Sequence, residues 1–219
     1  FFLGQLFNCM ALYRGDVSLV TPIMGVKVVF VSVLAVFLLT DEPTAGVWIG
    51  AVLSTAAILL LRGSEHADKA RVIPSILLGL LSALFFAGFD ILVQRYGTKL
   101  GFEELVSRMF TFSFLWSLLL VRKFHHNLNE VSRRTWGWLA LGGILHSSQA
   151  IILAFVLTTY GQAAKVNIFY SSRAFWSIAL VWFIGHWFSN YEKHQGHTVF
   201  IRRLIGSCLL GVAIVLASL

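Results

Sequence analysis

The chain has 219 residues, of which 58% are hydrophobic and only 12% are charged, and its formal net charge is +7 at pH 7. A soluble fold of this length cannot bury so much apolar surface, so the composition excludes a soluble globular protein and predicts an all-α, polytopic membrane protein. The basic surplus lies mainly in short loops, such as the one with Arg133 and Arg134, which is typical of a bilayer surface and predicts no nucleic-acid partner.

Apolar runs follow one another along the chain, separated by short polar turns. A bilayer core about 30 Å thick needs roughly 20 helical residues per crossing. Backbone polar groups must be satisfied within lipid, and no alternating pattern suggests a barrel, so we expect a helical bundle. In chain order, the expected helices lie at 1–13, 17–39, 45–61, 73–94, 103–121, 135–158, 162–187 and 198–218.

Two lone cations stand near the middle of long apolar runs. Lys27 lies in the second expected helix and Arg173 in the seventh, and each follows a glycine, Gly15 or Gly161, by twelve residues. A charge at bilayer depth costs from about 3 to more than 10 kcal/mol, so such residues normally face an interior or a water-filled path. We predict a site for an anionic group that the arginine clamps bidentately and the lysine attracts as a point charge.

The surroundings of the two cations look like distorted copies of each other. Matching Gly15 to Gly161 also aligns Val-Trp-Ile-Gly at 47–50 with Arg-Leu-Ile-Gly at 203–206. The second and seventh helices are five crossings apart, so they run in opposite directions. An inverted repeat of this kind predicts a transporter with its substrate near the midplane and with alternating access.

Polar residues near the cations are the candidates for contact with substrate. Residues three apart share one face of a helix, which groups Thr21 and Met24 with Lys27, and Asn167 and Tyr170 with Arg173. A polar patch with Gln149 and His146 in the helix 135–158 either lines the cavity or hydrogen-bonds to a neighbouring helix. The predicted substrate-binding residues are therefore Lys27, Arg173, Tyr170, Asn167, Gln149, Thr21 and Met24.

Asp90, in the expected helix 73–94, supplies the alternative. Its carboxylate could neutralise Lys27 or Arg173 in a structural ion pair with no ligand, or the cations could snorkel to the membrane surface. Asp90 and His146 are also candidates for proton coupling, whereas exchange of two anions would need no titrating group.

An enzyme is the main rival from another class. The sequence has no HExxH or GxSxG motif, and Asp90 is the acidic residue clearly inside a span. His125-His126 and His194-x-x-His197 lie in loops, where solvated basic turns account for them. We therefore expect no catalytic residues, no metal and no cofactor.

Two stretches carry a family resemblance. LLTDEPTAGVWIGAVLSTAAILLL resembles the end of an EamA-type repeat of the drug/metabolite transporter superfamily. The part from SILLGLLSALFFAGFDILVQRYG to RRLIGSCLLGVAIVLAS is similar to a whole five-helix EamA unit, and Arg108 fits an arginine that the family often carries. The resemblance implies that 1–63 is the C-terminal part of a first repeat, helices 3–5 of ten, and that 72–219 is a complete second repeat, helices 6–10, with the first two helices missing. It implies a multi-pass permease or exporter of small organic metabolites, expected in a bacterial plasma (inner) membrane.

The stretch VKVVFVSVLAVFLLTDEPT resembles a helix of the sugar-phosphate and nucleotide-sugar branch, where a lysine and a basic repeat mate hold an anionic group. Lys27 and Arg173 match these two places, although the usual proline and acidic residue after the lysine are absent. The resemblance implies an anionic small-molecule substrate but no substrate name. The alternative is an exporter of neutral or cationic metabolites or amino acids, with both cations paired structurally to Asp90.

Small residues recur every four positions in two expected helices. Gly46, Gly50 and Ser54 form one such ridge, and the residues Gly79, Ala83 and Ala87 form another. Such ridges predict close helix crossings within the chain, and they also leave open a homodimer.

Overall fold

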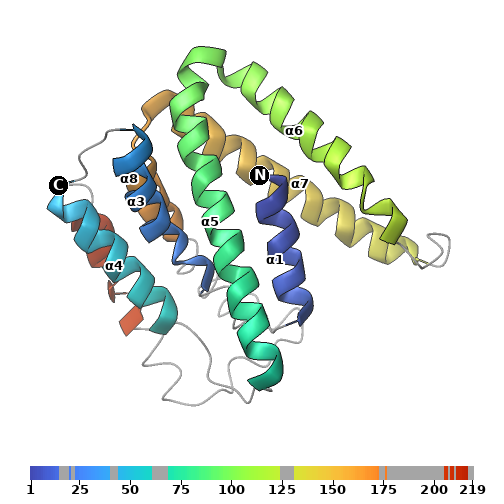
Figure 1. Cartoon of the computed structure of the whole chain (residues 1–219), viewed down its shortest axis with the longest axis horizontal. Coiled ribbons are helices and arrows are strands. Elements are labelled where there is room, and N and C mark those ends of the chain that lie inside the picture. The colour runs from blue at the N-terminus through green and yellow to red at the C-terminus, as the bar shows by residue number, and fades with distance from the viewer. Residues whose placement is uncertain are drawn as a thin grey trace. The chain divides into compact units, whose positions relative to one another are not determined.

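A computed structural model describes residues 1–14, 20, 23–39, 44–60, 69–123, 131–172, 176, 205–206, 208–209 and 211–216. These residues are almost entirely helical and contain no strand, which confirms the predicted all-α class for the described ranges. The helices, shown in Figure 1, are α1 (Phe2–Arg14), α3 (Lys27–Leu39), α4 (Ala45–Leu60), α5 (Lys69–Leu100), α6 (Phe102–Leu118), the short 3₁₀ helix η1 (Val121–Lys123), α7 (Arg133–Tyr160) and α8 (Ala163–Ser171).

The structure corrects two predicted helices. The expected helix 17–39 is not continuous, because residues 25 and 26 form a turn and α3 begins only at Lys27. The expected helix 73–94 is too short, because α5 runs on to Leu100 and stops at Gly101, whose φ of 82° is in the region that favours glycine. The predicted loop at 95–100 is therefore helical.

Residues that directly flank α7 determine where this helix begins and ends. The side chain of Ser132 caps its N-terminus by accepting a hydrogen bond of 3.1 Å from the backbone N–H of Thr135. Gly161, with a φ of 66°, ends the helix and donates its N–H to the carbonyl of Leu157. The observed bounds lie within two residues of the predicted span 135–158.

The chain divides into two compact units. Unit 1 contains Phe1–Phe2 and Leu92–Gly161, and unit 2 contains Leu3–Ile91 and Gln162–Leu219, so the boundary passes through α5. In unit 1, α6 packs on α7, and Gly97 of α5 lies directly against the side chain of Thr158. Large apolar side chains on α6 and α7 are exposed, which fits helices whose solvent is lipid.

In unit 2, α3, α4 and α8 pack side by side (Figure 1). Small residues allow close approaches here: Ser82 of α5 donates a hydrogen bond of 2.7 Å to the carbonyl of Gly4 on α1. The ring of Phe86 fills the space beside Gly4. Ser54 and the two alanines Ala83 and Ala87 are fully buried, which confirms the prediction of close crossings on these helices.

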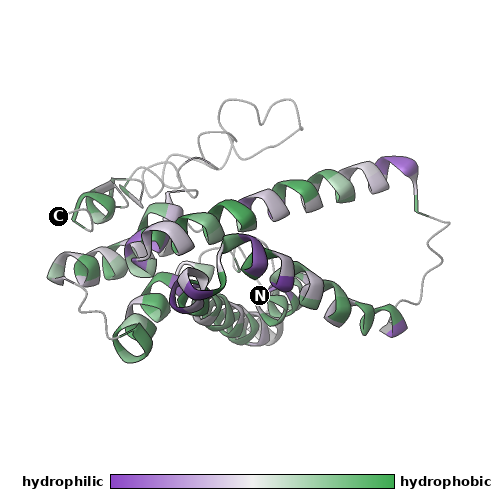
Figure 2. Cartoon of the chain, turned by 90° about the horizontal axis from the view of Figure 1, so that it is seen from above, coloured by the Kyte–Doolittle hydropathy of each residue, from purple (hydrophilic) through white to green (hydrophobic). Residues whose placement is uncertain are grey.

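Two described helices are long and apolar enough to cross a membrane: Ile73–Leu100 within α5, and α7. Shorter apolar helices are α3 and the segment Ala45–Ala57 of α4. Figure 2 shows that much of the described ribbon is coloured as hydrophobic. By length and composition, these helices fit the helical membrane protein that the composition predicts.

Candidate functional site around Lys27, Asp90 and Asn167

A break in the helical backbone sets the position of Lys27. Ile23 and Met24 are helical, Gly25 and Val26 form a turn, and α3 starts at the next residue. The N–H groups of Val26, Val28 and Val29 each bond to a carbonyl three residues earlier, which is the tighter pattern of a 3₁₀ turn. Lys27 consequently stands at the N-terminal end of α3, where the helix dipole favours negative charge.

The break leaves the Gly25 carbonyl outside a regular helical ladder, and α4 helps to satisfy it. This carbonyl accepts the N–H of Val28 at 3.3 Å, and the hydroxyl of Thr55 lies 3.4 Å away. The same hydroxyl is 2.9 Å from the carbonyl of Ala51, so its single proton bonds mainly within α4. A serine or threonine on a neighbouring helix is the usual support for a broken helix in a membrane.

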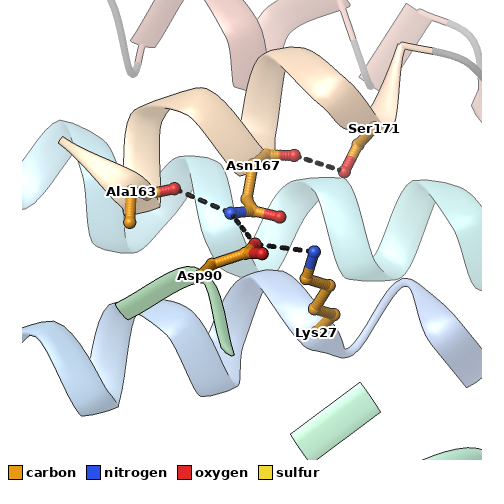
Figure 3. Close-up of polar contacts among 5 residues, drawn as sticks. All are labelled: Lys27, Asp90, Ala163, Asn167 and Ser171. Carbon is orange, nitrogen blue, oxygen red and sulfur yellow. Dashed lines mark hydrogen bonds and ion pairs between the residues drawn. The ribbon is translucent and has the colours of Figure 1, made fainter. Parts of the chain in front are cut away.

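Lys27 forms a buried ion pair with Asp90 of α5. The Lys27 Nζ lies 2.6 Å from Oδ2 of Asp90, as Figure 3 shows. The exposed fraction of the Lys27 side chain is 10%, whereas that of Asp90 is 1%. Lys27 is therefore the more exposed member of the pair, although both side chains are buried.

Asn167 of α8 is the third member of the cluster. Its Nδ2 donates to Oδ2 of Asp90 at 2.7 Å and to the carbonyl of Ala163 at 2.9 Å. Both partners are acceptors, so the orientation of the amide is fixed with the nitrogen toward Asp90. Ser171 donates to the Asn167 carbonyl at 2.9 Å, one helical turn on. The cluster thus joins α3, α5 and α8 within unit 2 (Figure 3).

Two aromatic rings flank the ammonium. The Lys27 Nζ is 5.8 Å from the ring centroid of Phe86 and 5.5 Å from that of Tyr170. At these distances the faces of aromatic rings attract a cation. Together with Asp90, the rings replace part of the hydration that the ammonium loses on burial.

Two buried acceptor atoms of the cluster have no hydrogen-bond partner among the described residues. They are Oδ1 of Asp90 and Oδ1 of Asn167. An unsatisfied buried acceptor costs about 1–3 kcal/mol, so two of them in adjacent side chains call for an explanation.

The structure brings together four of the residues that the sequence singled out: Lys27, Asp90, Asn167 and Tyr170. Asp90 is the charge partner of Lys27, which is one of the roles that the sequence predicted for it. Met24 is half-buried on the other side of the turn, so the continuous helix that grouped it with Lys27 is wrong, and its contact with substrate stays a prediction. Arg173 and Thr21 lie outside the described residues.

The other two candidates, His146 and Gln149, belong to unit 1. The His146 ring is exposed and stacks on Phe1, with ring centroids 6.3 Å apart. Arg108, also in unit 1, pairs with Glu104 one turn earlier on the exposed surface of α6. The roles of His146 and Gln149 toward a substrate stay predictions.

Sequence reasoning missed the part that Phe86 plays beside Lys27. The signal was present, because Phe86 precedes Asp90 by four residues and therefore shares its helix face. The hydrogen bond from Asn167 to the backbone carbonyl of Ala163 could not be predicted in this way, because no side chain of Ala163 takes part in it.

Known proteins resemble this chain in part of its sequence and in its fold. Residues 1–63 match the model of the EamA-like transporter family, which confirms the predicted resemblance for this part of the chain. The second unit at 72–219 and the likeness to the sugar-phosphate branch stay predictions. No curated protein matches the chain. A solved structure titled "Crystal structure of protein" is similar to the chain, with 14% sequence identity and a TM-score of 0.75, and the match covers 99% of this chain and 74% of that one. At this identity, the similarity establishes the fold.

The match covers 63 of the 219 residues of the chain, and the family that it names is one of transporters.

Proposed function

We propose that this chain, whose residues 1–63 match the EamA-like transporter family, is a secondary transporter that moves a small organic metabolite by alternating access. Its two inverted repeats, 1–63 and 72–219, would rock against each other around a site at Lys27. The proposed location is a bacterial plasma (inner) membrane.

The observation that carries the proposal is the buried ammonium of Lys27 at the start of a broken helix. In secondary transporters, discontinuous helices direct their N-terminal ends toward anionic groups of the substrate. The α3 N-terminus and the lysine add their positive fields at one place. The greater exposure of Lys27 than of Asp90 favours an anion over a cation as the arriving group. Arg173 is proposed as a second ligand of the same anion.

One observation favours a second candidate function. The 2.6 Å pair between Lys27 and Asp90 compensates the lysine charge without any ligand. In this alternative, the pair is structural and the transporter exports neutral or cationic metabolites or amino acids.

Ligand-dependent thermal stabilisation of the full chain in detergent separates the two candidates. Sulfate, methyl phosphate and acetate would be compared with neutral and cationic solutes, using the wild type, Lys27→Ala and Arg173→Ala. We expect anions to stabilise the wild type and each substitution to weaken that effect about tenfold or more in ligand concentration. Lys99→Ala is the matched control, because Lys99 is an exposed lysine at the end of α5.

A charge swap, Lys27→Asp with Asp90→Lys, sharpens the comparison. A structural pair predicts that the swap restores both folding and transport in liposomes. An anion site predicts that the swap restores folding but not stabilisation by anions, because the more accessible position then carries a carboxylate. Stabilisation by neutral or cationic solutes alone would remove the anion from the proposal.

A further inference from the structure

We propose that the two unpartnered oxygens of Asp90 and Asn167 form a proton-binding site, and that an anion bound at Lys27 loads it with one proton. The coupling to an anion rests on the proposed function, whereas the proton site itself does not. The site would make the transporter carry an anion and a proton together.

The geometry of Asp90 and Asn167 is that of a pair lacking one proton. One of the two hydrogen bonds that such a pair can form is present, since Nδ2 of Asn167 donates to Oδ2 of Asp90 at 2.7 Å. The other oxygen of each group has no donor among the described residues. Figure 3 shows the carboxylate and the amide facing each other. Both remaining atoms are acceptors while Asp90 is ionised, so they cannot bond to each other.

A single proton on Oδ1 of Asp90 resolves this. The carboxyl group then donates through Oδ1–H to Oδ1 of Asn167, while Oδ2 keeps the amide N–H. Each unpartnered acceptor then becomes half of a hydrogen bond. Reversal of the Asn167 amide is no substitute, because its nitrogen is held by two acceptors, Asp90 and the carbonyl of Ala163.

In this proposal, the position of the Lys27 ammonium determines whether Asp90 binds the proton. In the structure its ammonium lies at Oδ2 of Asp90 and favours the carboxylate form. An anion that reaches the ammonium competes with Asp90 for it. A carboxylate that is 99% buried and loses its cation is strongly disfavoured, and taking up a proton from the solvent neutralises it.

The charges balance in this exchange. Before binding, the cluster contains one ammonium and one carboxylate, so its net charge is zero. After a monoanion binds, it contains an ammonium, the bound anion and a neutral carboxyl group, and its net charge is again zero. A dianion such as sulfate brings one more negative charge, which the proposed second ligand Arg173 would compensate, so one proton per anion is expected in both cases. Linkage is reciprocal, so a proton on Asp90 also releases Lys27 for the anion.

The helices that pack around Asp90 carry few other charged or titratable groups. On α8 these are Tyr170, which lies beside the ammonium of Lys27, and the half-buried Lys165, and the described side chains of α4 include none. On α1 the groups are Cys9, Tyr13 and Arg14, and all are exposed. Arg173 lies outside the described residues and is tested by substitution.

The first experiment needs no ligand. In Lys27→Ala, which removes the ammonium, the infrared spectrum should show the carbonyl band of a protonated carboxyl group at neutral pH. The band should be absent from the wild type and from Lys27→Ala with Asp90→Asn. Lys27→Gln gives the same readout if the alanine variant does not fold. A Lys27 variant without this band would overturn the proton site, whatever anions the protein binds.

The second experiment tests the coupling in the wild type with sulfate, which does not itself titrate near neutral pH. Calorimetry in buffers of different ionisation enthalpy should report about one proton taken up per sulfate bound, and the affinity should fall about tenfold per pH unit as the pH rises. Asp90→Asn should bind sulfate with neither proton uptake nor pH dependence. In Arg173→Ala, each sulfate that binds should still be accompanied by the uptake of about one proton. Binding without proton uptake would refute the coupling. An absence of sulfate binding beside a positive infrared result would instead count against the anion site.

Discussion

Removing the carboxylate of Asp90 should destabilise the protein far more than removing an exposed charge. In Asp90→Asn the ammonium of Lys27 stays buried but loses its counter-ion. At the observed 2.6 Å and an effective dielectric constant of about 20, the Coulomb attraction is about 6 kcal/mol, and desolvation of both charges offsets much of it. Truncating one partner of a buried pair costs about 3–5 kcal/mol, because the other charge is left uncompensated.

The assay is unfolding of the full chain in mixed micelles, followed for Asp90→Asn, Lys27→Met and the double variant. We expect the double variant to be more stable than the sum of the two single losses predicts, by at least about 1 kcal/mol. Glu104→Gln is the matched control, because its pair with Arg108 leaves the two side chains 48% and 58% exposed, and such pairs contribute about 0–1 kcal/mol. If Asp90→Asn unfolds within about 0.5 kcal/mol of the wild type, or if the single losses add, the pair is not energetically coupled and the reasoning fails.

Three further predictions concern packing and backbone support. Gly97→Ala should cost about 1–3 kcal/mol in unfolding measurements, because the new methyl group meets the Thr158 side chain, whereas Gly88→Ala on the same helix meets nothing and should be neutral or slightly stabilising. Asn167→Leu should weaken thermal stability by about 1–3 kcal/mol at neutral pH, since Asp90 loses a donor. The loss should grow at lower pH, because protonated Asp90 would lose its acceptor as well, and a loss that shrinks would contradict the proton site. Thr55→Val should cost less than about 1 kcal/mol, because its bond to the helix break is long; a larger loss would mean that this bond is what holds the break.

The sequence predicted the helical class and most of the helix positions, because long apolar runs with short polar turns have few alternatives in a bilayer. Helix ends were less accurate. The end of α5 depends on the conformation of Gly101, and the turn at Gly25 lies inside an apolar run whose composition hardly changes.

The cluster was only partly predictable. Lys27 and Asp90 stood out because charges inside apolar runs are rare. Their pairing, and the contact of Asp90 with Asn167, join residues far apart in the chain, and they depend on how each helix is rotated about its axis. In helices that are apolar on all sides, the sequence does not indicate which face points to the interior, so the rotation of each helix about its axis cannot be predicted. The ion pair and the ligand site therefore remained open alternatives.

The separation of Lys27 and Asp90 along the chain has a consequence for biosynthesis. The ribosome completes α3 long before α5, so the lysine enters the translocon without its counter-ion, at an insertion cost of about 3 kcal/mol if it reaches the middle of the bilayer. Its place at the first residue of a 13-residue helix lets the ammonium remain near the membrane surface until the aspartate arrives. Nascent chains that end before Asp90 should therefore hold α3 shallowly or incompletely inserted, and chains that include α5 should hold it fully inserted. Glycosylation mapping of the two lengths would show the difference, and equal insertion at both would mean that the lysine enters without help.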